Sequence, residues 1–112
     1  SVNIPGLLTA GNVSGTIMAT QRVGGGYGTG NSASAAVTST AEGATYIVTG
    51  SRHTNSSNVT NVMAQVTYGG TVRAITIINA GTSISVTESA GVISVNNTGT
   101  AANITMSFNR VY

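Results

Sequence analysis

Few residues in this sequence are able to do acid–base or metal chemistry. Glu42 and Glu88 are the only carboxylates, His53 is the only histidine, and Asp, Cys and Lys are absent. A two-carboxylate glycosidase would need both glutamates, but each lies beside an expected turn and nothing in their spacing indicates that they converge. One histidine without Cys or Asp cannot complete a metal site in one chain, and a serine triad would have to use a glutamate. The sequence therefore predicts no catalytic residue, no metal and no cofactor.

Residue types that bind sugars are better represented. Saccharides are bound by aromatic faces that stack on the ring and by Asn, Arg and hydroxyl groups that bond its edges. Five such residues lie in or beside expected connections between strands: Tyr27, Arg52, His53, Asn55 and Tyr68. We predict that they bind carbohydrate. The alternative is that the tyrosines are packing residues, since aromatic residues are only 4% of the chain.

Two charged residues fall at positions expected to point inward. Glu88 continues the apolar alternation of Ile84 and Val86, and Arg110 continues that of Met106 and Phe108. Because charges at inward positions need partners, we predict a structural ion pair between Glu88 and Arg110, within a subunit or across an interface.

The elements that position these residues are all expected to be strands. From Thr82 to Tyr112, apolar residues alternate with Ser, Thr and Asn at the period of two that is typical of strands. Similar segments recur about every ten residues, without a credible helix, which predicts an all-β, antiparallel, jelly-roll-like β-sandwich. The expected strands, about eight in number, cover 16–23, 33–39, 44–52, 59–68, 71–79, 84–87, 92–95 and the region of 104–109.

Two connections raise separate questions. The glycine-rich stretch 24–30 invites comparison with a phosphate-binding loop, but no Lys follows it and no helix begins there. We therefore expect a flexible surface loop at 24–30, and a polar loop at 53–58. Residues 1–14 lack periodicity and contain Pro5, so we expect a linker from an upstream domain, cut at Ser1, ahead of a β-sandwich domain over 15–112.

The composition excludes some partners and favours self-association. The net charge of +2 comes from four scattered arginines, so nucleic-acid binding is not expected. No apolar run approaches the roughly 20 residues of a membrane helix, so no membrane span is expected. In the strand over 71–79, Val72 and Ile78 lie on one face and Ile75 and Ile77 on the other. A single two-layer sandwich would leave one set in water, which predicts a homo-oligomer.

The order of segments resembles a known family. It runs from ATYIVTGSR at Ala44–Arg52 through an Asn/Ser loop and a long strand to SISVTESAGVISVNNTGTAANITMSFNRVY. This order, over 15–112, is similar to the C-terminal domain of bacteriophage tailspikes and tail fibres. The resemblance implies a homotrimer on the virion tail that helps the spike assemble and resist denaturation, and that in some members contacts bacterial surface polysaccharide. It also implies that any depolymerase residues lie in an upstream domain, so this chain is not expected to be an enzyme.

Two alternatives stay open at this point. The first is a monomeric carbohydrate-binding module of a bacterial secreted enzyme, which would depend on exposed tyrosines. The second is a coat or surface-layer structural protein. Oligomeric state separates the first alternative from the tailspike interpretation.

Overall fold

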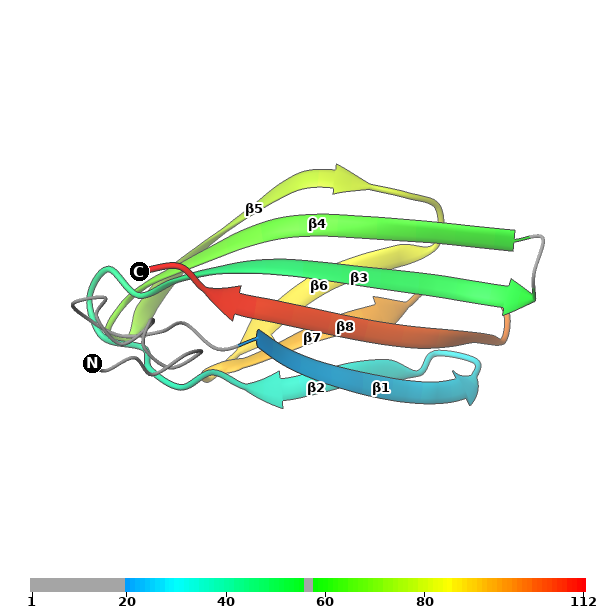
Figure 1. Cartoon of the computed structure of the whole chain (residues 1–112), viewed down its shortest axis with the longest axis horizontal. Coiled ribbons are helices and arrows are strands. Elements are labelled where there is room, and N and C mark those ends of the chain that lie inside the picture. The colour runs from blue at the N-terminus through cyan, green and yellow to red at the C-terminus, as the bar shows by residue number, and fades with distance from the viewer. Residues whose placement is uncertain (1–19, 56–57) are drawn as a thin grey trace, which may run out of the picture.

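The chain folds as an all-β protein in a computed structural model that describes residues 20–55 and 58–112. The expected linker over 1–14 and the start of the first expected strand lie outside these residues. The described residues form eight strands, and Figure 1 shows that they lie in two layers. Their bounds are β1 Thr20–Gly28, β2 Ser32–Ala36, β3 Thr45–Asn55, β4 Asn58–Gly69, β5 Val72–Ala80, β6 Ile84–Ser89, β7 Val92–Asn97 and β8 Ala102–Arg110.

The strands form two antiparallel sheets of unequal width. The large sheet has five strands in the order β1-β8-β3-β4-β5, and the small sheet has three in the order β2-β7-β6. Strands β3, β4 and β5 follow one another along the chain, and β8 returns to lie beside β3, as in a Greek key. The small sheet packs behind the large one, with β6 beneath β4 and β5 and with β2 and β7 beneath β8 (Figure 1). The expected sandwich-like fold is thereby confirmed at the level of two packed sheets.

The core lies between the sheets and follows the alternation in the sequence. Along β4, Val62, Ala64, Val66 and Tyr68 are buried, while the residues between them are wholly or partly exposed. Buried residues alternate with more exposed ones in the same way along β6, β7 and β8, because successive side chains leave opposite faces of a strand. At the centre the Tyr46 ring meets Tyr68 and Phe108 edge to face, with centroids 5.9 and 5.7 Å apart.

The glycine-rich stretch is a strand, and the prediction of a loop over 24–30 is wrong for most of it. β1 continues through Gly28 and pairs with β8 throughout, with a bulge between Gly24 and Gly26. A Cβ on Gly25 would lie 2.5 Å from the carbonyl oxygen of Ser32. The glycines thus let β1 bend over β2 at close range.

The predicted polar loop over 53–58 is also shorter than expected. β3 runs through Asn55 and β4 begins at Asn58, so His53 is a strand residue, paired with Val59 on one side and with Asn103 on the other. Residues 56 and 57 lie outside the described part of the chain. The sequence signal failed here because polar residues also occupy the solvent-facing positions of long strands.

Candidate functional site

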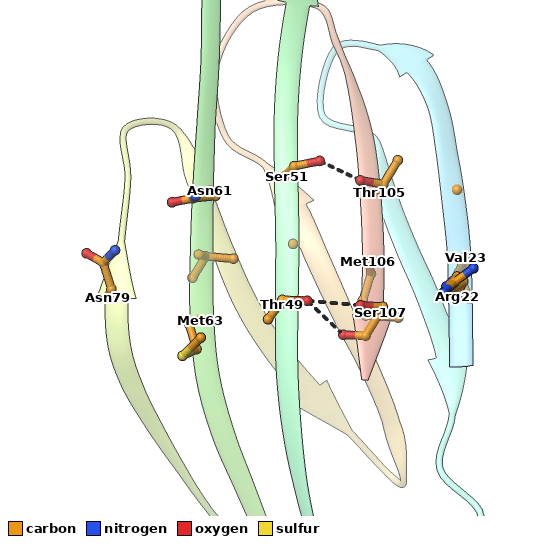
Figure 2. A pocket seen from close by; sticks show the side chains of 13 residues that line it. Arg22, Val23, Thr49, Ser51, Asn61, Met63, Asn79, Thr105, Met106 and Ser107 are labelled. Atoms are coloured by element: carbon orange, nitrogen blue, oxygen red, sulfur yellow. Dashed lines mark hydrogen bonds between the residues drawn. The ribbon is translucent and has the colours of Figure 1, made fainter. Parts of the chain in front are cut away.

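A hollow with a volume of about 730 Å³ lies on the outer face of the large sheet, away from the core. Strand register shows that two cross-strand rows form it (Figure 2). The first row, from β1 to β5, consists of Arg22, Ser107, Thr49, Met63 and Asn79. The second row consists of Gly24, Thr105, Ser51 and Asn61. We call this hollow the outer groove.

Hydroxyl groups cross-link the middle of the outer groove. Thr49 Oγ1 and Ser107 Oγ are 2.9 Å apart, and Ser51 Oγ and Thr105 Oγ1 are 2.5 Å apart. These bonds fix the side chains in one arrangement and leave oxygen lone pairs free to accept from a ligand. Met63, which is 40% exposed, adds an apolar surface beside them. The groove therefore offers both a polar rim and an apolar contact.

The groove carries one charge, and it is positive. Arg22 is the only charged residue among those that line it. The carboxylates lie elsewhere: Glu42 is in the turn between β2 and β3, and Glu88 is buried on the small sheet. Within the described part of the chain, Arg22 makes no ion pair. Its guanidinium is thus free to meet a negatively charged ligand.

Two of the predicted sugar-binding residues lie beside the outer groove. Asn103 pairs with Tyr27 on one side and with His53 on the other, so the three form a third row next to the Gly24 row. Tyr27 is 65% exposed, and His53 is half-buried. Asn55 ends β3, but its side chain lies outside the described part of the structure. The structure thus brings Tyr27 and His53 to one face.

Arg52 is not available to a ligand, which corrects its assignment to a sugar site. It is buried, and its Nε donates to Asn97 Oδ1 at 2.8 Å while Nη2 donates to Thr100 O at 3.0 Å. Asn97 Nδ2 in turn contacts Asn31 Oδ1 at 2.9 Å and Gly28 O at 3.0 Å. This network ties the β1–β2 and β7–β8 connections to the end of β3. Arg52 points inward because its strand phase continues that of the core residue Val48.

Tyr68 is likewise a buried residue and not a sugar platform. Its ring is in the core, and its hydroxyl donates to Glu88 Oε2 at 2.9 Å. Burial raises the pKa of the Tyr68 hydroxyl above the ordinary tyrosine value, and the hydrogen bond and negative charge of Glu88 raise this pKa further. The sequence alternative, in which a tyrosine packs in the core, holds for Tyr68.

Glu88 is inward as predicted, but its partner within the chain is Arg73 and not Arg110. Glu88 Oε1 lies 2.6 Å from Arg73 Nε in an ion-pair contact that is not aligned as a hydrogen bond. Glu88 Oε2 also accepts from the Gly91 amide at 2.7 Å. Arg110 instead donates Nε to Tyr112 O at 2.8 Å. The intramolecular pairing fails because Glu88 is on β6, beneath β4 and β5, while β8 lies over β2 and β7; pairing across an interface stays a prediction.

The edge strand β5 presents a second candidate surface. All nine of its residues are exposed, because β5 is the outer edge of the large sheet and the small sheet, which ends at β6, covers only part of it (Figure 1). Ile75 and Ile77 share the inner face, opposite the buried Val66 and Ala64, yet they are 36% and 44% exposed. Val72 and Ile78 are exposed as well. We call this surface the β5 overhang.

Comparisons with protein-family models, with curated proteins and with solved structures found no match. Among residues 20–55 and 58–112, no helix is long and apolar enough to cross a membrane. In the same residues, no three side chains of His, Cys, Asp or Glu gather as metal ligands. The candidate sites thus rest on the geometry of the outer groove and of the β5 overhang.

Sequence reasoning missed the outer groove itself. Its residues are Ser, Thr, Asn and Met at outward positions of separate strands, and such residues are common throughout this chain. The alternation in the sequence places Thr49 and Ser51 on the same face of β3, and Thr105 and Ser107 on the same face of β8. Only the strand order shows that these two faces are adjacent.

Proposed function

We propose that this chain is the terminal assembly domain of a bacteriophage tailspike or tail fibre, a jelly-roll-like sandwich that forms a homotrimer on the virion tail and contacts bacterial surface polysaccharide. The observation that carries the proposal is the β5 overhang. The overhang supports self-association directly. The assignment to a phage tail rests in addition on the sequence resemblance over 15–112. We assign no catalytic role to this chain, as expected from its sequence.

The β5 overhang has the properties of an interface. Long exposed edge strands normally carry Lys or Pro, or are short, because a bare edge pairs with other chains. β5 has nine residues, no Pro, and Arg73 as its only charged residue. Arg73 is engaged with the buried Glu88. The one charge on this edge is therefore paired within the same chain, which lessens its repulsion of a second copy.

The energy of covering the overhang is substantial for a protein of this size. Fully burying an isoleucine side chain is worth about 2 kcal/mol, and the overhang exposes Ile75, Ile77, Ile78 and Val72. In a cyclic trimer each copy covers the overhang of its neighbour, and the ring closes without leaving a free edge. The jelly-roll-like description is supported by β8 lying between β1 and β3, with β2 beside β7 in the other sheet.

The test of this proposal is the mass in solution. Light scattering after size exclusion at micromolar concentration should give three times the chain mass, and the band on an unboiled SDS gel should run as an oligomer. The double variant Ile75→Thr and Ile77→Thr should give a folded monomer, because it removes apolar surface from the overhang alone.

The matched control is Val92→Thr, which changes an exposed apolar residue on the outer face of the small sheet. This control should keep the trimer. A wild-type chain that is monomeric at micromolar concentration would overturn the assembly proposal.

A second function, a monomeric carbohydrate-binding module of a bacterial secreted enzyme, is favoured by the outer groove. The groove combines hydroxyl and amide side chains with apolar surface on the five-stranded sheet, and exposed Tyr27 lies nearby. A monomeric mass together with glycan binding would select this function. A trimeric mass would select the tail domain, whether or not glycan is bound.

A further inference from the structure

We infer that the outer groove binds an acidic polysaccharide, with Arg22 pairing with a sugar carboxylate and the sugar chain extending toward Tyr27. This inference rests on the polysaccharide contact in the proposed function and names its site and ligand class. It replaces the site predicted from sequence, since Arg52 and Tyr68 are buried.

The charge pattern selects an anionic sugar. Arg22 lines one side of the groove, makes no ion pair among the described residues, and has no carboxylate among the other lining residues. A guanidinium binds a carboxylate through two parallel, charge-assisted hydrogen bonds. Nothing in the groove repels an anion, and the whole chain carries a net charge of +2.

The groove also matches the neutral parts of a sugar ring. The amides of Asn61 and Asn79 stand on β4 and β5, and neither side chain makes a hydrogen bond to another described residue; both are thus free to bond sugar hydroxyls. The bonded hydroxyl pairs Thr49–Ser107 and Ser51–Thr105 present further acceptors. Met63 supplies an apolar contact for the C–H face of a ring.

The spacing of the rows fits an extended polymer better than a single small molecule. Successive rows on one face are separated by two residues along a strand, which is about 7 Å. The row of Arg22 is followed by the row of Gly24 and then by the row of Tyr27, Asn103 and His53. Gly24 has no side chain to block the path between them. Tyr27, which is 65% exposed, offers a ring for a sugar beyond the groove.

The same pattern disfavours a nucleic acid. A nucleic acid carries a phosphate at every nucleotide and its binding depends on several cations along one face. Apart from Arg22, the only side chain near this path that can carry positive charge is His53. A sugar chain also presents neutral hydroxyls on every ring, which the amide and hydroxyl side chains of the groove can bond, so a single guanidinium is enough to hold one carboxylate of the chain.

The experiment uses the full chain with two probes that share one sugar backbone: the anionic oligogalacturonate and its neutral methyl ester. Calorimetry and amide chemical shifts should show binding of oligogalacturonate at Thr49 and Ser51, and much weaker binding of the ester. Arg22→Gln should weaken oligogalacturonate binding about tenfold, the effect of losing a charged hydrogen bond. Arg110→Gln removes the same charge outside the groove and should leave binding unchanged.

Length dependence tests the direction of the sugar chain. Tyr27→Ala should weaken binding of long oligogalacturonates and leave the shortest bound fragment unaffected. Equal binding of acid and ester, or equal loss in Arg22→Gln and Arg110→Gln, would overturn the inference, as would absence of binding. Light scattering on the same samples reports the trimer separately, so a failed groove and a failed assembly are distinguished.

Discussion

Two buried charges lie toward opposite ends of the sandwich and are stabilised in different ways. Arg52, near the end of β3, is surrounded by neutral oxygens of Asn97 and Thr100. Glu88, near the β6–β7 turn, has Arg73 and Tyr68 as partners. The first charge depends on connections within the chain, whereas the second depends on an edge strand.

This difference determines which of the two buried charges a neighbouring copy of the chain can influence. The partners of Arg52 are Asn97 at the end of β7 and Thr100 in the β7–β8 connection, and Asn97 is bonded in turn to Asn31 in the β1–β2 connection, without any residue of β5. Glu88 meets Arg73, whose side chain is 47% exposed on the β5 overhang. A hollow of about 300 Å³ opens beside this pair. Covering β5 would therefore change the surroundings of Glu88 and leave those of Arg52 unchanged.

The largest expected effect is at the Arg52 end. Asn97→Ala removes the acceptor of Arg52 Nε and of the Gly99 amide, and the donor to Gly28 and Asn31. It leaves a buried cation with fewer partners, so the free energy of unfolding should fall by about 4 kcal/mol. Urea denaturation measures this loss.

The control for this variant is Asn96→Ala, which changes the neighbouring amide on the outer face of β7. Asn96 bonds Thr87 and Ser32 at the surface, so the loss should stay within about 1 kcal/mol. Equal losses in the two variants would mean that the Arg52 network adds nothing beyond a surface amide.

A smaller effect is expected at the Glu88 end. Glu88→Gln keeps an oxygen for Tyr68 and Gly91 but places an amide NH2 against the Arg73 guanidinium, so the free energy of unfolding should fall by about 2 kcal/mol. Glu42→Gln, in the exposed turn between β2 and β3, removes the same charge and should have little effect. If the trimer forms, the loss at Glu88 should depend on protein concentration, and the loss at Asn97 should not.

The smallest effect at neutral pH is expected from Tyr68→Phe. At pH 8 it removes one hydrogen bond to Glu88 and should lower the free energy of unfolding by about 1 kcal/mol. At alkaline pH the wild type should lose stability once pH exceeds about 10, because the unfolded chain then releases the tyrosine proton while folded Tyr68, with its raised pKa, retains it.

The phenylalanine variant lacks this proton, so its urea midpoint should fall less steeply between pH 9 and pH 11. Tyr27→Phe, which removes an exposed hydroxyl on β1, is the control and should follow the wild type. Parallel curves for wild type and Tyr68→Phe would show that Tyr68 does not couple to alkaline unfolding.

Much of the fold was predictable from the sequence because alternation fixes which residues face the core. The buried faces of β4, β6 and β8 follow it, and so does the inward position of Glu88. The glycine stretch was misassigned because glycine usually weakens strands, whereas here Gly25 allows two backbones to approach closely. That approach is a tertiary contact, and local sequence does not encode it.

The candidate site was less predictable because it depends on strand order. Alternation indicated that Arg110 and Glu88 point inward, but it did not show that β6 and β8 lie over different strands. Position in or beside a loop was taken as the mark of a sugar site, which favoured Arg52 and Tyr68 at the ends of their expected strands, but the structure buries both side chains. Tyr27 and His53 remain beside the outer groove because their strands place them on the outer face.

The cross-strand hydroxyl pairs have a consequence for the conditions the protein tolerates. Thr45 bonds Thr67 on the large sheet, and Ser34 bonds Ser94 on the small one. Such contacts join neutral groups, and charged residues are only 5% of the chain, so dissolved ions have little to screen. The free energy of unfolding should therefore change little between low and high salt concentration.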